Sequence, residues 1–256
     1  MEQLCVVCAS AMKDGLAPWH FICVSCGYEG TTLKPRINEP AAYAVLKEAD
    51  REAGLKNMRV ENFRVIVRAI RRLAQPGQKT LLDVGSAHGW FLQEAASLFT
   101  VTGIEPDQEV AARSRQGGHL VRTGFFPSVL IEHERFDVIV FNDVIEHIPA
   151  VNAAVAACIA HLNDDGLLVL NLPSSAGFFY RLSKILELPS IQAQGLLERV
   201  RWAGDLRGMR LWAQYLCVLC VLPVIHWFKS DIQVAIFRVT NHRPAISDLQ
   251  VVCKNL

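Results

Sequence analysis

The segment 81–96 constrains most strongly what this chain can fold into. It begins with a short apolar run that predicts a buried strand, continues with a glycine-bearing turn at 85–89, and then has apolar residues at helical spacing over 90–99. A strand, a turn and a helix in this order bring backbone N–H groups and the positive end of a helix to one point. In an open α/β sheet that point lies at the carboxyl ends of the strands, where nucleotide-like cofactors bind.

Two acids and the spacing of the turn indicate which cofactor fits. Glu105 ends the next predicted strand, 101–105, where a carboxylate can accept hydrogen bonds from both hydroxyls of a ribose. A dinucleotide site needs G-x-G-x-x-G, but Gly85-x-Ala87-x-Gly89 has no third glycine where the phosphate needs it. S-adenosylmethionine has no phosphate, and Asp83 suits its cationic amino group, directly or through water. The pattern therefore favours S-adenosylmethionine.

The segment 136–148 predicts a second set of polar side chains at the carboxyl ends of the strands. An apolar strand at 138–141 follows Asp137, and polar residues follow the strand. We expect these residues over the cofactor crevice, with His147 as a general base oriented by Glu146. A structural role for His147, capping the next helix, is an alternative, and so is a divalent-ion site. The three residues of that site would be Asp143, Glu146 and His147.

Four of the eight cysteines form two close pairs near the N-terminus. Fourteen residues separate Cys5-x-x-Cys8 from Cys23-x-x-Cys26, a spacing that suits a tetrahedral structural Zn²⁺. We predict a zinc ribbon over 1–34, in which the metal supplies most of the folding energy. Two redox-active dithiols are the alternative. The pattern favours a reducing compartment, so a cytoplasmic location is expected.

The remaining elements follow from periodicity. A helical lead-in is expected over 41–75, with Val60, Phe63, Val67 and Ile70 on one face. Its arginines, at 64, 68, 71 and 72, lie on another face, which is either solvated or a surface for an anionic partner. Further helices are predicted at 107–116 and 152–162, and a turn at 163–166. Strands are predicted at 119–121 and 167–173, with an edge strand at 231–238.

These stretches together resemble class I methyltransferases. LLDVGSAHGWF resembles their first signature, D-V-G-x-G-x-G, with Ala87 for the middle glycine, and FDVIVFNDVIEHIP resembles their fourth-strand signature. The closer resemblance is to bacterial methyltransferases with an N-terminal zinc ribbon. It implies a Rossmann-like class I sheet over 76–243, with helices on both faces. The candidate cofactor-binding residues are Asp83, Gly85, Ser86, Ala87, Gly89, Glu105, Pro106, Asn142 and Asp143.

The chain departs from that family at two places. Phe125 stands where many members have an acid that reads the adenine amine, so adenine recognition must rely on backbone groups or apolar stacking. After Arg181 the substrate cover is shortened or rebuilt, and an apolar insertion at 206–228 includes eighteen uncharged residues, 211–228. We weigh two interpretations of that run: peripheral contact with a bilayer surface such as the inner membrane, and a core helix or oligomer contact.

The expected activity is methyl transfer from S-adenosylmethionine to an oxygen or nitrogen of a small-molecule, lipid-linked or polysaccharide-linked acceptor. The 256 residues are 51% apolar and 20% charged, with a net charge of +1, which gives no global sign of nucleic-acid binding. An RNA methyltransferase is one alternative, but Lys13, Lys34 and Arg36 in the first forty residues are balanced by acids. A cofactor-binding module without catalysis is the other. The sequence indicates no oligomeric state.

Overall fold

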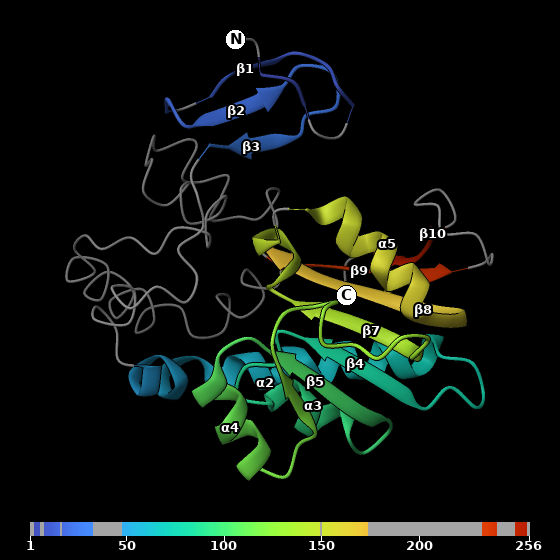
Figure 1. The fold of residues 1–256 in the computed structure, drawn as a ribbon. Coiled ribbons are helices and arrows are strands. Elements are labelled where there is room, and N and C mark those ends of the chain that lie inside the picture. Colours follow the sequence, from blue (N-terminus) through green and yellow to red (C-terminus); the bar gives the residue numbers. More distant parts are fainter. Residues whose placement is uncertain are drawn as a thin grey trace. The chain divides into compact units, whose positions relative to one another are not determined.

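The computed structural model describes residues 3–5, 8–15, 17–32, 48–148, 150–173, 232–239 and 249–254 (Figure 1). The chain divides into two compact units, Met1–Leu46 with Pro173–Ile232, and Lys47–Leu172 with Gln233–Leu256. The apolar insertion predicted at 206–228 lies outside the described residues. Within the described ranges, no helix has both the length and the apolar content needed to cross a membrane.

The described part of the first unit is a three-stranded antiparallel sheet. Its strands are β1 (Met12–Asp14), β2 (His20–Cys23) and β3 (Glu29–Thr31), in that order. His20 is fully buried, and its Nε2 lies 3.0 Å from Oε2 of Glu29. Strands of three and four residues enclose very little apolar surface, so a sheet of this size needs a metal or a covalent link for stability.

The second unit is built on a seven-stranded sheet with the order β10-β9-β8-β7-β4-β5-β6. From β6 to β8 every neighbouring pair is parallel, and β10 is antiparallel to β9. The strands are β4 (Thr80–Val84), β5 (Thr100–Glu105), β6 (Val121–Thr123), β7 (Phe136–Asn142), β8 (Leu162–Pro173), β9 (Ile232–Val239) and β10 (Leu249–Lys254).

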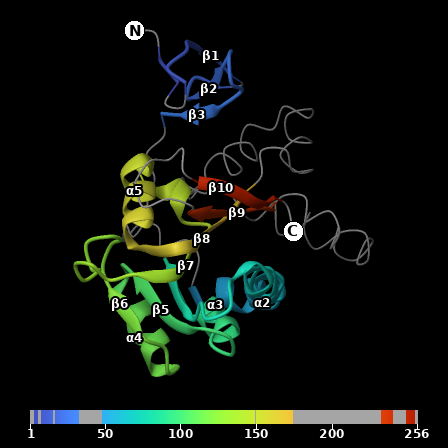
Figure 2. The ribbon, with the colours of Figure 1, turned by 90° about the vertical axis from the view of Figure 1, so that its right-hand side faces the viewer.

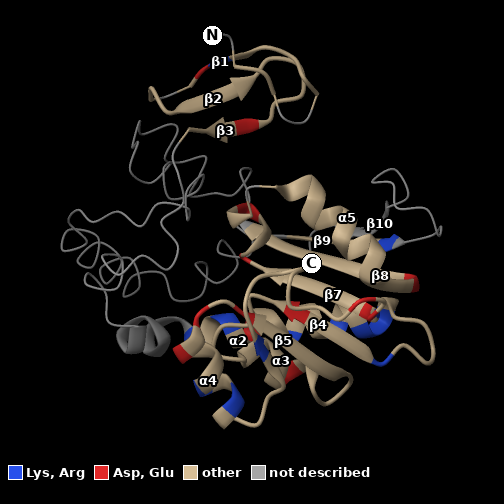
Figure 3. Cartoon of the chain, in the orientation of Figure 1, with Lys and Arg blue, Asp and Glu red and all other residues tan. Residues whose placement is uncertain are grey.

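Helices cover both faces of this sheet, as the sequence predicts. The helices are α2 (Glu48–Leu73), α3 (Trp90–Ala95), α4 (Gln108–Gln116) and α5 (Val151–His161). Figure 2 shows α2 and α3 on one face and α5 on the other. The central strands are therefore buried on both sides, which explains why β4 and β7 are mostly apolar and do not alternate with polar residues. Most of the sheet is tan in Figure 3, and Lys and Arg gather on α2 and α4. The predicted Rossmann-like fold is confirmed.

The buried face of α2 agrees with the predicted lead-in helix. Phe63, Val67 and Ile70 are buried, and Phe63 meets the ring of Phe91 edge-on at 5.4 Å between centroids. The four arginines of the other face are exposed, and Nε of Arg64 lies 3.0 Å from a carboxylate oxygen of Glu94. This arrangement favours the interpretation of a solvated basic face.

Several element boundaries differ from the prediction, including the start of β7 at Phe136 instead of residue 138. The helix after the turn ends at Ala95 instead of residue 99, where the Ser97 hydroxyl bonds the carbonyl of Glu94 and so competes with the helix. Strand β6 lies two residues later than predicted. The turn predicted at 163–166 lies within β8 as an irregularity, because Leu162 pairs with Phe136 and Leu167 already pairs with Val138.

The interpretation of 231–238 as the edge strand is wrong. Strand β9 lies between β8 and β10, and Leu249–Lys254 forms the edge. The sheet consequently extends past residue 243. Strand β10 is six residues long and carries Gln250 and Lys254, as edge strands often carry polar and charged residues. Its short run of apolar residues is too weak a pattern to be recognised in the sequence.

Asp137 lies near the amino end of β7, at the opposite end of the strands from the candidate site, and its hydrogen bonds link β7 to β4 and β8. Its carboxylate accepts hydrogen bonds from the backbone N–H groups of Lys79 and Thr80, at 2.7 and 2.8 Å, and from Nδ2 of Asn163 at 2.8 Å. Burial opposes ionisation, but these bonds outweigh it and lower the pKa of Asp137. A lowered pKa stabilises the fold at neutral pH, and that contribution is lost as the pH falls through it.

Candidate functional site

The turn after β4 is held against the neighbouring strand β5. The backbone N–H groups of Gly85 and Ser86 both donate to the carbonyl of Ile104, at 2.8 and 2.9 Å. Gly85 has a φ of +75°, and a Cβ there would lie 2.5 Å from Cγ2 of Val144. Gly89 also has a positive φ and closes the turn with a bond to the carbonyl of Ser86. Glycine is therefore required at both positions, by the left-handed backbone and by the side chains that pack against them, Val144 at Gly85 and Ser114 at Gly89.

Glu105 is fixed in place before any ligand binds. Its Oε2 accepts the N–H of Ala87 at 2.9 Å, and its Oε1 accepts the N–H of Asp107 at 2.9 Å. Each carboxylate oxygen has a second lone pair, which can accept a hydrogen bond from a hydroxyl. Burial raises the pKa of Glu105 despite these bonds. This geometry fits the predicted role in binding a ribose. Pro106, the next residue, is half-buried.

A row of buried polar side chains crosses the carboxyl ends of three neighbouring strands. Nδ2 of Asn142, on β7, donates to Oδ1 of Asp83, on β4, at 3.2 Å. Nδ2 of Asn171, on β8, donates to Oδ1 of Asn142 at 3.3 Å. Burial, aided by the charge of Glu105, raises the pKa of Asp83 to about 8, although the bond from Asn142 opposes the rise. A buried acid of this kind favours a cationic ligand, which would restore its charge.

Sequence reasoning missed Asn171 as a member of this row. The only signal for it was a polar residue inside the apolar run of β8, near its carboxyl end. Its partner in the sheet is Asn142, which the sequence had placed at the site. The contact between them depends on strand register, which periodicity alone does not give.

The other residues predicted from 136–148 lie in the loop after β7. Asp143 has a φ of +55°, and its Oδ2 lies 3.5 Å from Nη2 of Arg59, on α2. Glu146 and His147 are half-buried in the short 3₁₀ helix η1 (Ile145–His147). Their acid–base roles stay predictions. The divalent-ion alternative gains no support, because the only converging group of metal-ligand atoms in the described part of the chain belongs to the four cysteines.

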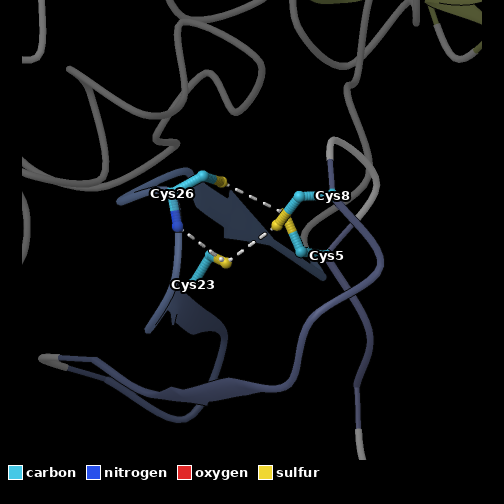
Figure 4. A group of neighbouring side chains, drawn as sticks. All are labelled: Cys5, Cys8, Cys23 and Cys26. Carbon is cyan, nitrogen blue, oxygen red and sulfur yellow. Dashed lines mark hydrogen bonds between the residues drawn. The ribbon is translucent and has the colours of Figure 1, made fainter.

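The four predicted zinc ligands converge in the small sheet (Figure 4). Their sulfur atoms all lie within 4.8 Å of one another, with Cys5 and Cys26 at 3.6 Å and Cys8 and Cys23 at 3.5 Å. Tetrahedral zinc with Zn–S bonds of about 2.3 Å places its sulfurs about 3.8 Å apart. Hydrogen bonds from Ser10 lower the pKa of the Cys8 thiol to about 6, which favours the thiolate that zinc requires. The donor set therefore fits Zn²⁺.

Two glycine substitutions distinguish the steric clash of a Cβ with Val144 from the strain of a positive φ. Gly85→Ala is expected to weaken cofactor binding by more than about tenfold and to cost about 2 kcal/mol more stability than Gly77→Ala. Both residues have a positive φ, but a Cβ at Gly77 meets nothing within 4 Å. Urea unfolding and titration with S-adenosylhomocysteine measure the two effects. Equal losses in the two variants would show that Val144 does not constrain the turn.

Sequence comparison matches the chain to methyltransferases. The sequence profile of a methyltransferase domain matches residues 57–220. A ubiquinone biosynthesis O-methyltransferase of Paramagnetospirillum magneticum is 35% identical over 98 residues, which are 35% of this chain and 39% of that protein. The chain thus matches about two fifths of the length of that curated relative.

Solved structures give similar matches. An amino pentose methyltransferase of Micromonospora echinaspora, solved with S-adenosylmethionine bound, is 29% identical with a TM-score of 0.39, over 43% of this chain and 49% of that one. A possible histamine N-methyltransferase of Thermotoga maritima is 17% identical with a TM-score of 0.48, over 68% of this chain and 78% of that one.

Proposed function

Because the chain belongs to the methyltransferase domain family, we propose that it transfers a methyl group from S-adenosylmethionine to an oxygen or nitrogen of a small-molecule, lipid-linked or polysaccharide-linked acceptor. The observation that carries this proposal is the pairing of a buried Asp83 with a pre-oriented Glu105 across adjacent strands. One acid suits a cationic amino group, and the other suits a ribose. S-adenosylmethionine presents both groups.

Each residue of the site would bind a different group of the cofactor. Asp83, held by the NH₂ group of Asn142, would bind the amino group, Glu105 would accept the ribose hydroxyls, and the turn from Gly85 to Gly89 would border the cofactor. Bound there, S-adenosylmethionine supplies a methyl group activated by its sulfonium. The protein mainly aligns the acceptor with this group and excludes water.

The loop after β7 would complete the acceptor side. We assign His147 the role of general base, which removes the acceptor's proton, and Glu146 the role of its orienting partner. Asp143 would border the cofactor. The Paramagnetospirillum relative is named as an O-methyltransferase of ubiquinone biosynthesis, which supports an oxygen nucleophile on an organic acceptor. The four cysteines would hold a structural zinc ion.

The test is calorimetric titration with S-adenosylhomocysteine, the demethylated product. The wild-type chain is expected to bind at micromolar concentration, and Glu105→Ala to bind at least about tenfold more weakly, because two charge-assisted hydrogen bonds to ribose are lost. Glu109→Ala is the control, since Glu109 is exposed on α4. A folded protein that does not bind contradicts the proposal.

Methyl transfer itself separates the remaining alternatives. Protein that binds the product is incubated with methyl-labelled S-adenosylmethionine and cell extract, and the label is followed into solvent-extractable, water-soluble and RNA fractions. Label in lipid or small molecules supports the acceptor class proposed here. Label in RNA supports an RNA methyltransferase, and binding without any transfer supports a non-catalytic module.

A further inference from the structure

We propose that Asn171 is a positioning residue of the cofactor site, which acts through Asn142 to hold the Asp83 carboxyl in the orientation that binds the cofactor's amino group. The inference rests on the proposed function, because it concerns how the same site receives its ligand. It extends the site to β8, one strand beyond the residues predicted from the sequence.

The direction of the hydrogen bonds gives Asn171 this role. Nδ2 of Asn171 donates to Oδ1 of Asn142, so the carbonyl of the Asn142 amide points toward β8 and its NH₂ group points toward Asp83. An amide turned by 180° would present its oxygen to the carboxylate and repel it when ionised. With the donor of Asn171 in place, Asn142 supports the charged form of Asp83.

The backbone of Asn171 serves the same loop. Its carbonyl accepts the N–H of Asp143 at 2.9 Å, and Asn171 pairs with Asn142 in the parallel register of β7 and β8. Asp143 has a φ of +55°, a left-handed conformation that is uncommon for non-glycine residues, although aspartate adopts it more readily than most, and the bond to Asn171 holds its N–H in place. One residue of β8 thus fixes both the amide that faces Asp83 and the first residue of the acceptor-side loop.

Folding stability does not explain an asparagine at this position. Asn171 is 1% exposed, and its Oδ1 has no hydrogen-bond partner among the residues that the structure describes. A buried acceptor left without a partner costs stability. Nearby residues of β8 on both faces of the sheet, Leu167, Leu168 and Val169, are aliphatic and equally buried. An amide here is therefore unfavourable for the core, and its contact with Asn142 accounts for it.

The experiment compares two asparagines on the same strand. Asn171→Ala is expected to weaken S-adenosylhomocysteine binding by about tenfold, the effect of losing a hydrogen bond that supports a charged group. Asn163→Ala is the control, because Nδ2 of Asn163 bonds Asp137 at the opposite end of β8. That variant should lose stability and keep the wild-type dissociation constant. Asn171→Leu removes the same amide but fills the space of the side chain, so a loss of binding in both variants cannot be caused by a cavity.

The pH profile distinguishes positioning from packing. Asp83 is faced by Glu105 and Asn142, and without Asn171 the support of Asn142 is lost while the repulsion from Glu105 remains. The midpoint of the pH dependence of binding should therefore move upward in both Asn171 variants. Binding within about twofold of wild type, with an unchanged midpoint, would overturn the proposal. Absence of binding in the wild-type chain would instead refute the proposed function.

Discussion

At pH 8, Asp83→Asn is expected to abolish measurable binding of S-adenosylhomocysteine while making the free protein more stable. The two effects have one cause. The carboxyl group of Asp83 is fully buried, and burial together with the nearby Glu105 raises its pKa to about 8. Its negative charge is costly in the free protein and becomes favourable only when a cationic amino group binds beside it.

The sign of the pH dependence follows from this raised pKa. The pKa of Asp83 in the folded protein lies above its unfolded value of 3.8, so the folded state binds the proton more tightly. The stability that this proton binding contributes is fully present below pH about 4 and is lost as the pH rises through the folded pKa of about 8. The loss amounts to a few kcal/mol, since each tenfold change in proton affinity corresponds to about 1.4 kcal/mol. Asparagine keeps the shape of the neutral acid and carries no charge, so the variant should melt about 5 °C or more above wild type at pH 8.

Binding should show the opposite pH dependence. Because the ligand requires the ionised acid, wild-type affinity should rise by up to about tenfold per pH unit between pH 6 and pH 8. Asp137→Asn is the matched control, since Asp137 lies at the other end of the neighbouring strand and has a lowered pKa. It should lose stability and keep its affinity. Wild-type affinity in Asp83→Asn, or a lower melting temperature at pH 8, would contradict the prediction.

The contrast between these two aspartates shows what the sequence can and cannot predict. Both aspartates are flanked by apolar residues in the sequence. Asp83 was predicted to lie at the site because a glycine-bearing turn follows it. The central strands, the turn and Glu105 were predictable because each has a strong local pattern. The hydrogen bonds that move the pKa values of the two acids join residues 26 to 59 positions apart in sequence, so they depend on strand register.

The same reason explains the two largest omissions. Strand β10 pairs with β9 through backbone groups, and its own short sequence carries little periodic signal. Asn171 looks like an interruption in a buried strand until β8 is set beside β7. In both cases the missing information is which strand lies next to which. The convergence of the four cysteines was easier to predict, because the spacing within each C-x-x-C pair is itself local.

Removal of zinc is expected to have the largest structural effect on the N-terminal segment. The strands of its sheet are three and four residues long, and the buried side chains in the described part of the segment are those of Cys5, His20 and Cys23. Structural zinc contributes about 10 kcal/mol or more to folding of such segments, far more than this small core provides. Cys23→Ser, or chelation of the full chain, should therefore leave the segment open to protease.

The convergence of all four sulfurs favours zinc over the redox alternative. A redox-active C-x-x-C motif needs only its own two sulfurs, whereas here the four Sγ atoms lie within 4.8 Å of one another, and the contacts of Cys5 with Cys26 and of Cys8 with Cys23 cross from one motif to the other. We expect one zinc ion per chain by elemental analysis, and its loss in Cys23→Ser. Cys158→Ser is the control, because Cys158 is a buried residue of α5, outside the small sheet, and this variant should keep the full zinc content. A zinc-free chain that resists protease, or a disulfide within either motif, would refute the zinc site.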